Sequence, residues 1–156
     1  MRHALRLAGL SLLCVLAGVA AERADAARRT RTAGAALATD SRFRAKGRIV
    51  ARRQEPTRKL PAHETLELRL TRLDSASVYG LWLDSPLDAS NALVHVPPYS
   101  ITPRRDRTAV VRWDDAKDGL PFGATLEQLA TQRFQLRDGT GEVIMTGTVP
   151  ALRPPK

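Results

Sequence analysis

Apolar and polar residues alternate along much of the chain with a period of two, which is typical of half-buried β-strands. The clearest example is the segment TLELRLTRL, where Leu66, Leu68 and Leu70 alternate with polar residues. Patterns of this kind predict strands at 42–50, 65–73, 78–83, 92–96, 108–113, 133–137 and 142–149. We expect the run at 92–96 to end at Pro97-Pro98, because proline has no N–H to donate to a ladder.

The last two predicted strands form a β-hairpin, since Asp138-Gly139-Thr140-Gly141 between them supplies glycines for a tight turn. Residues 126–130 have helical character, and Thr125 is placed to cap them. About seven strands with one short helix or helical turn predict an all-β fold. We expect a small antiparallel β-sandwich over residues 42–150, with a small barrel as the alternative.

The first 26 residues have the pattern of a signal peptide. A basic start with Arg2 and Arg6 precedes an uncharged stretch at 7–21, and small residues follow. The uncharged stretch is shorter than the roughly 20 residues of a membrane-spanning helix. We expect cleavage after Ala26, or alternatively after Ala21, and an exported protein that is periplasmic or extracellular.

The single cysteine, Cys14, lies inside the predicted signal peptide. Cleavage would leave a mature chain without cysteine, so neither a disulfide nor a cysteine-based metal site is expected there. The domain is therefore expected to be stable through packing alone.

Positive charge is concentrated near the N-terminus. The chain has a net charge of +9, and residues 28–59 hold eleven Arg and Lys against two acids, whereas residues 60–156 are close to neutral. Residues 27–41 are small, polar and basic, which predicts a flexible leader, and residues 151–156 are predicted to be a disordered tail.

Basic residues of the first predicted strand share one parity and would line one face of it. With two neighbours they are our candidate anionic-ligand site. Its members are Arg42, Arg44, Lys46, Arg48, Arg52 and Arg53. The expected partner is an anionic polysaccharide, a lipid headgroup or an acidic protein. Two alternatives need no ligand: charge that protects an edge strand from aggregation, and the arginine-rich composition of a GC-rich genome.

No pattern of catalytic, metal-binding or cofactor-binding residues stands out. The chain has no GxSxG and no P-loop, and His63 and His95 fall on different predicted elements. The basic segment contains almost no aromatic residues, which disfavours specific binding of single-stranded nucleic acid. Trp82 is on the opposite parity from the apolar residues of its strand, so it is the aromatic residue to check for surface exposure.

The region 65–149 resembles the small Ig-like β-sandwich modules of secreted bacterial proteins of unknown function. The resemblance rests on three segments, LELRLTRL, VYGLWL and FQLRDGTGEVIMTGTV. It implies a sandwich fold outside the cytoplasm, and it implies no functional residue. The leading hypothesis is therefore an exported, non-enzymatic binding or scaffolding protein of the cell envelope. The alternatives are an exported hydrolase with an unrecognised site and an accessory subunit that uses a sheet edge.

Overall fold

The computed structural model describes residues 30–87 and 92–154. Contacts divide the chain into two compact units, Met1–Thr30 and Arg31–Lys156. The predicted signal peptide, residues 27–29 of the predicted leader and residues 155–156 of the predicted tail lie outside the described residues. Within the described ranges, no helix is both long and apolar enough to cross a membrane.

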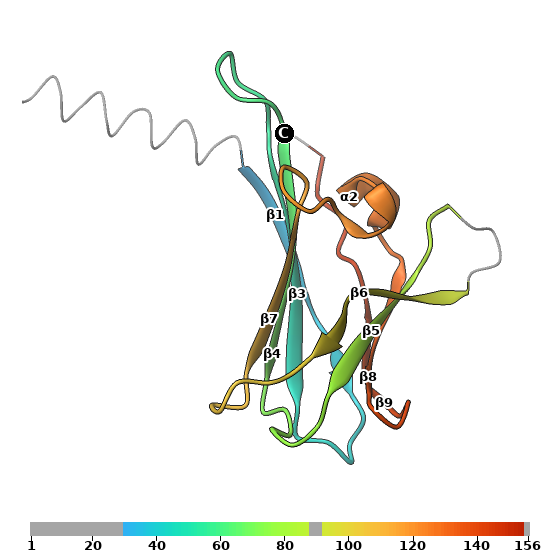
Figure 1. The fold of residues 1–156 in the computed structure, drawn as a ribbon. Helices are drawn as coiled ribbons and strands as arrows, with labels where there is room; N and C mark the ends of the chain where they lie inside the picture. The colour runs from blue at the N-terminus through green and yellow to red at the C-terminus, as the bar shows by residue number, and fades with distance from the viewer. Residues whose placement is uncertain (1–29, 88–91, 155–156) are drawn as a thin grey trace, which may run out of the picture. The chain divides into compact units, whose positions relative to one another are not determined.

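Most of the described residues belong to two β-sheets. The strands are β1 (Thr30–Ala36), β2 (Ala38–Thr39), β3 (Lys46–Gln54), β4 (His63–Thr71), β5 (Tyr79–Asp84), β6 (Leu93–Ile101), β7 (Ala109–Asp114), β8 (Arg133–Asp138) and β9 (Val143–Thr148). One sheet has the order β1-β3-β4-β7 and the other β2-β9-β8-β5-β6, and the two form separate layers in Figure 1. The prediction of a mostly antiparallel, all-β fold is confirmed, and the barrel alternative is wrong.

The seven strands predicted from alternation correspond to β3 through β9, with shifted ends. Their apolar parity is buried as expected: Leu66, Leu68 and Leu70 of β4 are each at most 1% exposed. Side chains of both sheets, including Ile49, Leu81 and Phe134, belong to one hydrophobic cluster. Burial of one side-chain parity on each strand therefore holds the sheets together.

The predicted end of β6 at Pro97-Pro98 is wrong, because the strand continues to Ile101. β6 is the edge of its sheet, so one side of its backbone needs no partner and proline is tolerated there. The ladder with β5 is irregular at this point, with a register shift between Tyr79 and Leu81.

The predicted helix is confirmed as the single turn α2 (Leu126–Leu129), which follows a 3-10 turn, η1 (Pro121–Gly123). Thr125 and Gln128 form a capping box at its start. This exchange of hydrogen bonds satisfies N–H groups that the first helical turn leaves without an intrahelical partner.

The first strands correct the prediction of a flexible leader. β1 lies beside β3, whereas β2 pairs with β9, so the chain changes sheets at Leu37. Leu37 is only 7% exposed, and its N–H donates to the Gly47 carbonyl at 2.9 Å. A Cβ added at Gly47 would lie 2.7 Å from one methyl carbon of Leu37, and a Cβ added at Gly147 would lie 2.5 Å from the other. A single buried leucine thus anchors a segment whose other residues are small and polar.

The prediction of a disordered tail is also corrected for residues 151–154. Leu152 is partly buried against the core. The carbonyl of Arg153 accepts a hydrogen bond of 3.1 Å from Arg31 of β1. The tail therefore contacts the first strand of the domain.

Candidate anion-binding face

Three of the six candidate cations share the outer side of β3. Lys46, Arg48 and Arg52 are exposed, and they alternate with core residues such as Ile49 and Ala51. Residues two apart on a strand are separated by about 6.6 Å, so these charges extend over roughly 20 Å. β3 lies between β1 and β4 and is not an edge strand, which removes edge protection as the explanation for its charge.

Neighbouring strands add two more cations to the same side. Arg69 of β4 lies directly opposite Arg48, and Arg112 of β7 lies opposite Glu67. Their side chains are 58% and 53% exposed. We define the basic face by five residues: Lys46, Arg48, Arg52, Arg69 and Arg112.

Only part of this charge is balanced within the sheet. Glu67 pairs with Arg69, and Asp114 pairs with Arg112 at 3.3 Å. Among the described residues no carboxylate pairs with Lys46, Arg48 or Arg52. Like charges that lie directly opposite each other on neighbouring strands are destabilising. Arg48 and Arg69 form such a pair. An anion bound between them would relieve this repulsion, so the face is suited to binding one.

The backbone of β1 leaves room for Arg48. A Cβ added at Gly34 would lie 3.0 Å from Nη2 and 3.1 Å from Nε of Arg48. The guanidinium therefore lies over a position that has no side chain. Small residues on β1 let a long cation lie flat across the sheet.

Arg42 and Arg44 do not continue the stripe on β3, which corrects the prediction of four cations on one strand. Both precede the strand, which starts at Lys46. Arg42 pairs with Asp40 at 3.0 Å and with Glu142 at 2.6 Å. Hydrogen bonds from Arg42 hold the pKa of Asp40 below its ordinary value, and the two carboxylates raise the pKa of Arg42. Arg44 is exposed, but Arg42 is locally neutralised.

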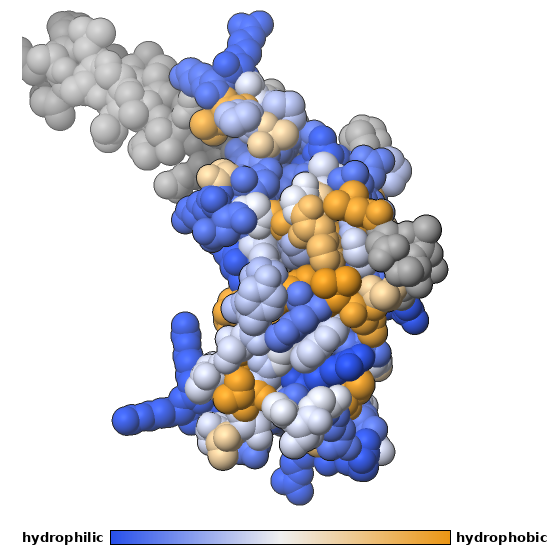
Figure 2. Space-filling view, turned by 45° about the vertical axis from the view of Figure 1, so that its right-hand side comes forward, coloured by the Kyte–Doolittle hydropathy of each residue, from blue (hydrophilic) through white to orange (hydrophobic). Residues whose placement is uncertain are grey.

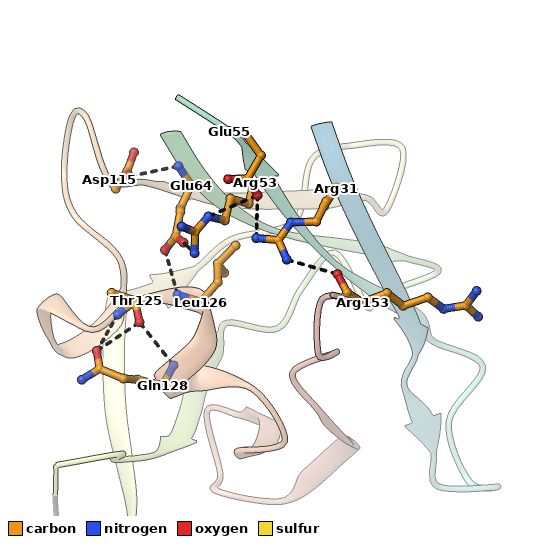
Figure 3. Close-up of polar contacts among 9 residues, drawn as sticks. All are labelled: Arg31, Arg53, Glu55, Glu64, Asp115, Thr125, Leu126, Gln128 and Arg153. Atoms are coloured by element: carbon orange, nitrogen blue, oxygen red, sulfur yellow. Dashed lines mark hydrogen bonds and ion pairs between the residues drawn. The ribbon is translucent and has the colours of Figure 1, made fainter. Parts of the chain in front are cut away.

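Arg53 points to the other side of β3 and belongs to a charge-balanced network at one end of the sheet (Figure 3). It pairs with Glu64 at 3.2 Å, and Arg31 pairs with Glu55 at 2.6 Å. Glu64 is 7% exposed and also accepts the Leu126 N–H at 2.8 Å. This network ties β1, β3 and β4 to α2, which is a structural role.

A pocket of about 340 Å³ beside this network tests the hydrolase alternative. Its polar lining consists of Arg31, Arg53 and Glu127, and the rest is apolar. Hydrolysis by a nucleophile needs a serine, cysteine or threonine beside a base. The lining residues supply neither, so this pocket does not favour a hydrolase.

The outer side of the other sheet carries an aromatic ladder that includes Trp82, which is half-buried. His95 stacks on Trp82 with ring centres 4.2 Å apart, Tyr99 meets His95 edge-on, and the Arg137 guanidinium lies 4.9 Å from the Trp82 ring. The Trp82 ring is therefore already in contact with a stacked ring and a cation, which leaves less of it for a ligand. On the side shown in Figure 2, apolar residues are interrupted by hydrophilic ones.

Sequence reasoning missed Arg69 and Arg112 as members of the basic face. The alternation in β4 already placed Arg69 on the polar side, but the register with β3 was needed to set it opposite Arg48. No family model matches the chain, and no curated protein matches it in sequence.

Proposed function

We propose that this protein is an exported, non-enzymatic β-sandwich of the cell envelope that binds an anionic polysaccharide through the basic face. The observation that carries the proposal is the row of cations on an interior strand. Lys46, Arg48 and Arg52 have no carboxylate partner among the described residues, and Arg48 faces another arginine.

The shape of this charge favours a linear polymer. The cations project from a sheet over a distance of roughly 20 Å, without the enclosing pocket that a small anion requires. Val50 takes the position between Arg48 and Arg52, so the cations are about 6.6 and 13 Å apart, and such a row of charges still suits a chain of repeating anionic groups. The face holds five cations and two carboxylates, Glu67 and Asp114, so its net charge is positive.

Other observations support a polysaccharide over the remaining anionic partners. Among the described residues of the basic side, Val110 is the only exposed large apolar one, at 52%, whereas surface insertion into lipid needs several such residues. The face has no aromatic residue for stacking nucleic-acid bases. The expected signal peptide would bring the domain to a compartment that contains envelope polysaccharides.

The test is retention on immobilised heparin across a salt series. The face variant carries Lys46→Ser, Arg48→Ser and Arg52→Ser. A matched control carries Arg58→Ser, Arg105→Ser and Lys117→Ser, which removes the same charge from exposed loops. We expect the face variant to elute at lower salt than the control. The slope of log affinity against log salt concentration should become shallower by about one unit for each cation removed.

Equal elution of the two variants would mean that only net charge matters, and it would refute the proposal. Vesicles with an anionic lipid provide the second comparison. If vesicles bind the wild type and discriminate between the variants while heparin does not, the partner is a lipid surface and the polysaccharide proposal is wrong.

A further inference from the structure

The start of β4 and the end of β7 lie side by side and bring a histidine and two aspartates together. Thr65 pairs with Asp114 in the antiparallel ladder, so the chain before Thr65 lies beside the chain after Asp114. His63 starts β4, and Asp115 follows directly after β7. The sequence separates these residues by about fifty positions, which is why no ligand spacing was visible.

The three side chains form a compact set of donors. His63 Nδ1 lies 2.7 Å from Asp115 Oδ1, and His63 Nε2 lies 3.5 Å from Asp114 Oδ1. One ligand atom from each residue can be chosen so that all three lie within 4.8 Å of one another. Asp114 is buried, whereas His63 is about one third exposed, so the set is reachable from solvent.

Hydrogen bonds hold both carboxylates in place. Asp115 Oδ2 accepts the Glu64 N–H at 2.9 Å. Asp114 Oδ1 accepts the Ala116 N–H at 3.2 Å, and its Oδ2 accepts from Arg112 at 3.3 Å. Such supporting contacts orient the ligands of protein metal sites.

Each nitrogen of the His63 ring lies near a carboxylate oxygen. An imidazole binds a metal ion through the lone pair of one nitrogen, and its other nitrogen can carry an N–H that donates to a carboxylate. The carboxylates around the ring are therefore placed either to bind a metal ion together with His63 or to orient its ring.

We propose that His63, Asp114 and Asp115 bind one divalent transition-metal ion, with zinc as the best match. One imidazole nitrogen and two carboxylate oxygens are ligands that zinc accepts, and water can complete a tetrahedral site. Calcium takes six to eight oxygen ligands, and this set offers two carboxylates and a nitrogen. Bound metal would join the start of β4 to the turn after β7. This inference does not depend on the proposed function.

The test is isothermal titration of the full chain with Zn²⁺, in a Cys14→Ser background so that the thiol contributes no ligand. We expect one site per chain and a melting temperature that rises with zinc concentration. His63→Gln and Asp115→Asn should each weaken the affinity about tenfold or more, since they remove a ligand charge or nitrogen. Asparagine at 115 can still accept the Glu64 N–H, so that variant tests the metal separately from folding.

His95→Gln and Asp118→Asn are the matched controls, because they remove a histidine and an aspartate outside the cluster and should bind zinc as the wild type does. Absence of binding to the wild type would overturn the proposal. Binding that survives His63→Gln unchanged would overturn it as well, because the zinc would then lie elsewhere.

Discussion

Replacing Leu37 with alanine tests whether the basic N-terminal segment is part of the folded domain. Leu37 is 7% exposed and lies between Gly47 and Gly147, where neither neighbour has a side chain that could fill the space it leaves. Leucine-to-alanine changes in cores destabilise by 2–5 kcal/mol, and more when the site cannot collapse. We therefore expect Leu37→Ala to lower the free energy of unfolding by about 3 kcal/mol.

Urea unfolding followed by far-ultraviolet circular dichroism measures this change. With an m-value of about 2 kcal/mol/M, the midpoint should fall by about 1.5 M. Thr32→Ala is the control, since Thr32 is an exposed residue of β1, the strand just before Leu37, and should change stability by less than about 0.5 kcal/mol. A Leu37→Ala effect as small as that of the control would mean that the segment is detached, and the reasoning about the sheet change would be refuted.

Two further predictions concern charge. The Thr140 hydroxyl and the backbone N–H of Glu142 donate to Asp138 and hold the pKa of this carboxyl below its ordinary value, so its contribution to stability is present at neutral pH and is lost as pH falls through the lowered pKa. Between about pH 5 and pH 2 the urea midpoint of the wild type should therefore fall more than that of Asp138→Asn, and parallel curves would contradict this. Separately, Glu67→Gln should raise the salt needed to elute the protein from heparin, because it removes a carboxylate from the basic face. Glu127→Gln on α2 removes an equal charge elsewhere, and an equal shift in both variants would contradict a role for the face.

Period-two alternation was sufficient to predict β3 through β9, because these strands contain large apolar side chains that the core buries, such as Ile49, Leu68 and Phe134. β1 has no such side chains. Its sequence, TRTAGAA, has small or polar residues on both parities. It forms a strand because it pairs with β3 and because Leu37, which follows it directly, is buried in the core. Local propensity does not contain that information.

Only part of the candidate site was predicted, because the side on which a strand residue lies is a local property whereas the pairing of its charge is not. Parity correctly placed Lys46 and Arg48 on one side of a strand, since it depends only on neighbours in sequence. Whether a cation is neutralised depends on distant residues: Glu142 lies beside Arg42, and Glu64 lies beside Arg53. The cluster of His63 with Asp114 and Asp115 was hidden in the same way, because the β4–β7 register creates it.

The change of sheets at Leu37 has a consequence for the order of folding. β2 emerges early during synthesis, but its partner β9 is the last strand of the domain, so Ala38 pairs with Thr146 only after nearly the whole chain is available. Contacts between residues so distant in sequence form late and slowly. A chain that crosses a membrane unfolded must not fold before it crosses. Because β2 cannot pair until β9 has been made, this part of the fold is completed late, which suits the export that we propose.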